Sequence, residues 1–170
     1  RVEMTARDTL NAALATIVVA ALIVSGIAPY DRLTWLMEVL PAMIALPLIA
    51  ATRKTYPLTT LLTILIALHC LVLIGGGAYT YARVPFGFLL QGLLSTTRNP
   101  YDKIGHFMQG FVPALVAREI LLRGAYVRGR RMTGFLCTCI ALAISACYEL
   151  IEWAAAISLG QGADEFLGTQ

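Results

Sequence analysis

The sequence predicts an all-α, polytopic membrane protein, and three observations support that fold class. Hydrophobic residues make up 58% of the chain and charged residues only 14%, with a mean hydropathy of +0.74. A soluble domain of 170 residues needs more charge than this to cover its surface. Several apolar runs approach or reach the length of about 20 residues with which a helix crosses the hydrocarbon core.

Five membrane-spanning helices are expected in one transmembrane domain over residues 1–170. They are predicted at residues 9–28, 33–51, 58–75, 99–123 and 132–159. The glycines at 75–77 are expected to end the third helix. Residues 79–98 are too polar to span, and their aromatic side chains are typical of a short interfacial segment between the third and fourth helices.

The basic residues predict that the N-terminus lies in the cytoplasm. This orientation places most of the 13 lysine and arginine residues, including those of the loop at 123–131, on the inner side. The net charge of +3 therefore reflects topology, and we expect no nucleic-acid partner. The four cysteines lie in apolar runs without the spacing of a metal finger or redox pair.

The fourth predicted helix carries an unusual polar stripe. Asn99 and Pro100 form a helix start, with Asn99 as the expected N-cap. Asp102, His106 and Gln109 follow at i, i+4 and i+7, so they share one face of an otherwise apolar helix. Polar groups at membrane depth usually face a bundle interior or a cavity, which makes this stripe the candidate site.

Other predicted helices bring acids and an imidazole to a similar depth. At about 1.5 Å per residue, Glu149 and Glu152 lie in the outer half of the fifth helix, on one face. Glu38 and His69 fall in the outer halves of the second and third helices, and Asp164 follows the fifth. We therefore expect one outward-facing pocket, with Glu38, His69, Gln109 and Asp164 around its central residues.

Carboxylates and imidazoles that converge in a low-dielectric pocket are ligands for a divalent cation of the manganese, iron or zinc type. The predicted metal ligands are Asp102, His106, Glu149 and Glu152, and the predicted catalytic residues are His106, Glu149 and Glu152. A metal there would polarise a phosphoryl or carbonyl oxygen or generate a hydroxide nucleophile. In such a metal-dependent hydrolase or transferase, His106 is either a ligand or the general base.

Each residue also has a structural interpretation. Asp102 can satisfy backbone donors in the first helical turn, and each histidine can donate one hydrogen bond across a helix interface. The two glutamates can pair with basic residues or stay protonated. A non-enzymatic subunit of a larger membrane complex, a small transporter and a haem held by the two histidines are the functional alternatives.

Four stretches resemble the YjdF-like family of predicted bacterial inner-membrane proteins. They are SGIAPYDRLTW, GGGAYTYARVPFG, RNPYDKIGHFMQGFVPALVAREIL, and ISACYELIEWAAA with GADEFLGTQ after it. The resemblance implies the bacterial inner membrane as the location and a sixth helix beyond Gln170. More distantly, the start of the fourth helix is similar to that of VanZ-like membrane proteins, which would place the substrate among envelope lipids or lipid-linked molecules.

Overall fold

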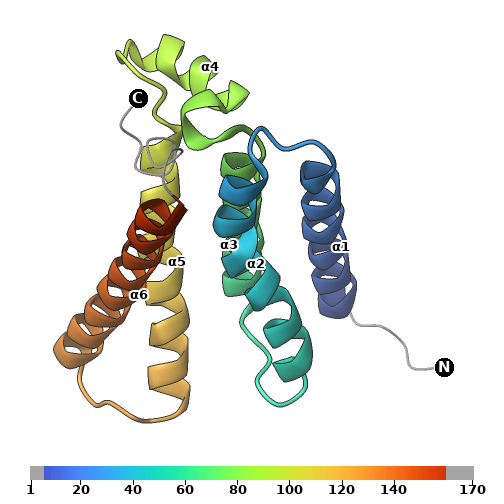
Figure 1. Cartoon of the computed structure of the whole chain (residues 1–170). Coiled ribbons are helices and arrows are strands. Elements are labelled where there is room, and N and C mark those ends of the chain that lie inside the picture. Colours follow the sequence, from blue (N-terminus) through green and yellow to red (C-terminus); the bar gives the residue numbers. More distant parts are fainter. Residues whose placement is uncertain (1–5, 160–170) are drawn as a thin grey trace. The chain divides into compact units, whose positions relative to one another are not determined.

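The computed structural model describes residues 6–159, and no strand occurs within that range. The chain forms α1 (Ala6–Ile27), α2 (Arg32–Thr52), α3 (Thr60–Tyr79), the 3₁₀ helix η1 (Tyr81–Arg83), α4 (Pro85–Leu94), α5 (Tyr101–Arg123) and α6 (Arg130–Leu159) (Figure 1). The all-α class predicted from composition is therefore confirmed.

Four of the five predicted spans are helices long and apolar enough to cross a membrane, namely α1, α2, α3 and α6. The remaining span is α5, the fourth in sequence order, which has 23 residues but is not among them, because its polar stripe and the charged pair Arg118 and Glu119 lower its hydropathy. The passage of α5 through the bilayer and the orientation of the chain stay predictions. With 10 residues, α4 is too short to span, as expected for the segment between the third and fourth predicted spans.

The chain divides into two compact units, Arg1–Val84 and Pro85–Gln170. In the first unit, α3 packs against both α1 and α2. The core of this unit gathers small and branched side chains from the three helices, which are Val18, Val39, Ala42, Ala67, Cys70 and Ile74. The single domain predicted over the whole chain stays a prediction.

The turn between α1 and α2 is fixed by local polar contacts. Asp31 is the N-cap of α2, and its carboxylate accepts the backbone N–H of Thr34 at 2.7 Å. This hydrogen bond, with weaker ones from Leu33 and Arg32, holds the pKa of the Asp31 carboxyl below its usual range. The indole of Trp35 donates to the Ser25 hydroxyl at 2.9 Å, which ties α2 back to α1.

The glycines at 75–77 do not end the third helix, contrary to the sequence prediction. Instead, α3 continues to Tyr79 and ends at Thr80, whose φ of 58° breaks the helix. Gly77 is buried, and a Cβ built there would lie 3.2 Å from the Cβ of Glu38 and 3.3 Å from the carbonyl oxygen of Trp35. The missing side chain at Gly77 therefore lets α3 pack closely on α2, a role that small residues often have between membrane helices.

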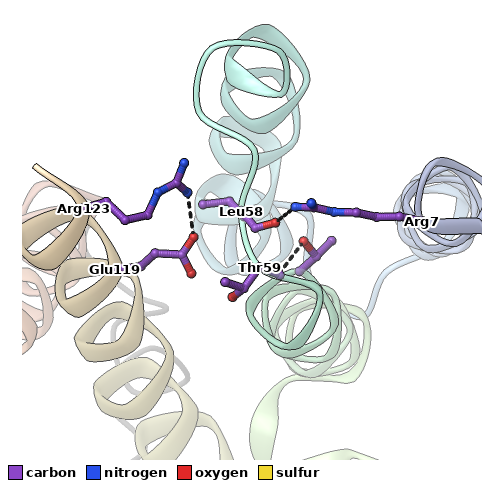
Figure 2. Close-up of polar contacts among 6 residues, drawn as sticks. Arg7, Leu58, Thr59, Glu119 and Arg123 are labelled. Atoms are coloured by element: carbon purple, nitrogen blue, oxygen red, sulfur yellow. Dashed lines mark hydrogen bonds and ion pairs between the residues drawn. The ribbon is translucent and has the colours of Figure 1, made fainter. Parts of the chain in front are cut away.

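Contacts at both ends hold the first unit in register. At one end, the Arg7 guanidinium donates to the carbonyl oxygen of Leu58, ahead of α3 (Figure 2). At the other end, the Tyr30 N–H donates to the Ala78 carbonyl at 3.0 Å, and the Arg83 guanidinium lies 3.9 Å from the centroid of the Tyr30 ring. The α1–α2 turn and the end of α3 thus lie together.

In the second unit, α5 and α6 form an antiparallel helical hairpin (Figure 1). Small side chains on one face of α6 are buried, namely Thr133, Cys137 and Ala141. Their spacing of four residues is the small-residue pattern that allows helices to approach closely. On α5, Gly105, Val112 and Ala117 are buried. This face determines which residues of the two helices lie opposite each other.

We predict that Gly77→Leu destabilises the protein by about 1–3 kcal/mol, because the new side chain would be forced against the α2 backbone. Gly110→Leu is the matched control, since a Cβ at Gly110 on α5 meets nothing within 4 Å. That variant is expected to be neutral or to gain up to about 1 kcal/mol from helix propensity. Thermal unfolding in detergent measures both, and equal stabilities would contradict the close α2–α3 packing.

Candidate functional site

The candidate site begins at the N-terminus of α5. The helix starts at Tyr101, and Pro100 occupies the N-cap without a side-chain hydrogen bond. The predicted cap, Asn99, therefore lies one residue further out, but its side-chain oxygen still accepts the Tyr101 N–H at 3.0 Å. Asn99 is buried, and Gly87 of α4 makes room for it, because a Cβ there would lie 1.7 Å from the Asn99 oxygen. No local sequence pattern predicts this use of Gly87.

One turn into α5, Asp102 and His106 are neighbours on one face. His106 Nε2 lies 3.3 Å from Asp102 Oδ1, which is an ion pair when the imidazole is protonated. Asp102 is in the first turn, where the positive end of the helix dipole stabilises a carboxylate. The predicted i, i+4 relation is confirmed, and it leaves the other imidazole nitrogen facing away from Asp102.

That second nitrogen faces α6. His106 Nδ1 lies 3.7 Å from Glu149 Oε1, so the imidazole stands between a carboxylate of its own helix and one of the neighbouring helix. Glu152, one turn further along α6, is half-buried and interacts electrostatically with Glu149 and with Asp102. The antiparallel hairpin therefore brings together all four predicted central residues.

The four residues form an open polar surface. The side chains of His106, Glu149 and Asp102 are 54%, 52% and 45% exposed, respectively. Gln109, one turn below His106, contributes a side-chain Nε2 that is buried without a hydrogen-bond partner. A ligand could reach the carboxylates directly, and the imidazole can hold or transfer a proton beside them.

The other predicted residues lie in the first unit or outside the described residues. Glu38 lies in α2 and is only 8% exposed, and His69 lies in α3 with its Nε2 buried and unpartnered. Both belong to the first unit, so their membership of the site stays a prediction. Asp164 lies outside the described residues.

Between residues 6 and 159, no group of three or more histidine, cysteine, aspartate or glutamate side chains is arranged to hold a metal ion. The donors at α5 and α6 have the right chemistry for a divalent cation, since one imidazole and three carboxylates lie near each other. Their present spacing is that of an open cluster, and metal binding stays a prediction.

Comparison with known proteins identifies the family. Residues 10–170 match the family described as "Predicted membrane protein (DUF2238)". The chain belongs to this family. It is also 64% identical over 149 residues to the inner membrane protein YjdF of Escherichia coli (strain K12), an alignment that covers 88% of this chain and 71% of that protein. No solved structure matches the chain.

These findings confirm the predicted family and the predicted location. The chain is an integral, multi-pass protein of the inner membrane, embedded in a lipid bilayer. The region that matches the family, residues 10–170, includes the α5 and α6 residues of the site as well as most of α1 and all of α2 and α3. The distant similarity to VanZ-like proteins stays a prediction.

We predict that cysteines at positions 106 and 149 can be cross-linked in native membranes by a short bifunctional thiol reagent. The variant combines His106→Cys and Glu149→Cys in a chain without its native cysteines. The matched control pairs His106→Cys with Leu142→Cys, because Leu142 is 65% exposed on α6. Equal cross-linking of the two pairs, or linking of the control alone, would rule out the α5–α6 register.

Proposed function

We propose that this inner-membrane protein binds a divalent cation at Asp102, His106, Glu149 and Glu152, and acts there on a lipid or lipid-linked envelope molecule. The single observation that supports the proposal is the placement of the His106 imidazole between Asp102 and Glu149. These side chains come from two helices, so the arrangement depends on the fold and not on sequence neighbours alone.

The charge balance of the site favours a cation. Within residues 6–159, His106 is the ion-pair partner of Asp102 and Glu149, and no lysine or arginine forms a salt bridge with either carboxylate. Three carboxylates beside one imidazole carry excess negative charge, which is costly near hydrocarbon unless protons or a cation neutralise it. A bound divalent cation would remove that cost.

The residues can divide the chemistry as follows. Asp102 would supply an oxygen ligand or orient the His106 imidazole, as carboxylates commonly do for functional histidines. Glu149 and Glu152 would supply oxygen ligands or hold a proton, and His106 would act as a nitrogen ligand or as the general base. A bound cation would supply Lewis acidity toward a phosphoryl or carbonyl oxygen.

The membrane setting limits the substrate class. The predicted cytoplasmic N-terminus would place the site in the outer half of the bilayer, near the headgroups of the periplasmic leaflet. The exposed cluster on the α5–α6 hairpin is open to molecules that lie in the membrane. Lipids and lipid-linked envelope molecules are therefore the proposed substrates.

The test is metal binding by the purified full chain in detergent. We expect stoichiometric manganese, iron or zinc by elemental analysis, with a stabilisation of about 2.7 kcal/mol at one hundred times the dissociation constant. His106→Ala and Glu149→Ala are expected to lose both. Glu119→Ala is the matched control, because it removes a glutamate that pairs with Arg123 outside the site.

Wild-type protein without metal, or equal metal in all variants, would overturn the proposal.

The half-exposed imidazole and carboxylates also suit a second function, in which a partner subunit covers them. A stoichiometric membrane partner in native purification, lost in His106→Ala and without bound metal, would favour that function.

A further inference from the structure

A second polar surface lies at the other end of the α5–α6 hairpin. It consists of exposed arginines at the end of α5, in the connecting loop and at the start of α6, which we call the arginine cluster. Its members are Arg118, Arg123, Arg128, Arg130 and Arg131. This surface belongs entirely to the second unit and shares no residue with the candidate site.

The arginine cluster is almost without counter-charge. Glu119 is the only acidic residue between Lys103 and Glu149 in the sequence. Its carboxylate already pairs with Arg123 at 2.9 Å (Figure 2). The Glu119 side chain is only 11% exposed. Within the described chain, the arginines at 128, 130 and 131 form no salt bridge, so this end of the hairpin carries unbalanced positive charge.

The start of α6 makes this positive charge more costly. Arg130 and Arg131 occupy the first turn of α6, which contains no acidic residue. A cation is unfavourable at this end of a helix, because the helix dipole is positive there. Mutual repulsion between these arginines adds to that cost, and an external anion would relieve both.

Exposed apolar side chains lie next to the arginines in sequence on both helices. Ile120 and Leu122 on α5 are 43% and 45% exposed, and Met132 and Phe135 on α6 are 52% and 63% exposed. A surface that combines guanidinium groups with neighbouring apolar groups matches a phospholipid, whose phosphate and acyl chains are joined in one molecule. A free phosphate or nucleic acid would use only the arginines.

We propose that the arginine cluster binds anionic phospholipid headgroups of the leaflet at which α5 ends and α6 begins. The guanidinium groups contact the lipid phosphates, and the apolar side chains of both helices contact the acyl chains. This binding fixes the loop end of the hairpin at the membrane surface, independently of the chemistry at His106.

The test compares lipid binding by the full chain in detergent micelles, using native mass spectrometry and thermal unfolding. Phosphatidylglycerol is titrated against phosphatidylcholine, with inorganic phosphate as the soluble anion. Each arginine near an anionic surface contributes roughly fivefold in affinity, so Arg130→Gln with Arg131→Gln should weaken phosphatidylglycerol binding roughly 25-fold. The stabilisation by phosphatidylglycerol should fall with it.

Arg53→Gln with Lys54→Gln is the matched control, because it also removes two exposed positive charges, but from the α2–α3 loop. We expect this variant to keep most of the wild-type response. An equal loss in both double variants would contradict a site at the arginine cluster, as would equal stabilisation by inorganic phosphate. Unfolding in phosphatidylcholine alone shows whether each variant is folded.

Discussion

The packing of α5 on α6 is the constraint on which the candidate site depends. Small side chains at Thr133, Cys137 and Ala141 form the buried face of α6, and they allow the two helices to lie close together. Once that face is fixed, the antiparallel register places Glu149 beside His106. A slip of one residue would rotate Glu149 by about 100° around the α6 axis and separate it from His106.

The two ends of this hairpin have opposite charge, and each end needs a counter-charge from its surroundings. Carboxylates around His106 accumulate negative charge at one end, while the arginine cluster accumulates positive charge at the other. In water, such groups would be solvated at little cost, but at a membrane their free energy depends on partners. A cation at one end and lipid phosphates at the other would meet the two needs separately.

The sequence predicted much of this arrangement, because helical period and membrane depth depend on local spacing. The pairing of Asp102 with His106 and the opposition of His106 and Glu149 followed from such spacing. The prediction that the glycines at 75–77 end the third helix was wrong, because glycine is common both at helix ends and where helices pack closely. Only the position of α2 beside Gly77 distinguishes the two roles. Glu38 and His69 share a predicted depth with the site, but depth alone does not determine which helices are neighbours.

The most direct test of the account is a distance measurement at His106 in the lipid bilayer. The chain has two histidines, so ¹⁵N-labelled imidazoles give two sets of solid-state NMR signals, and His106→Ala assigns them. The account predicts a dipolar contact between His106 Nδ1 and the ¹³C-labelled carboxyl of Glu149, which disappears in Glu149→Ala. A His106 signal that contacts Asp102 but no carboxyl of α6 would contradict it.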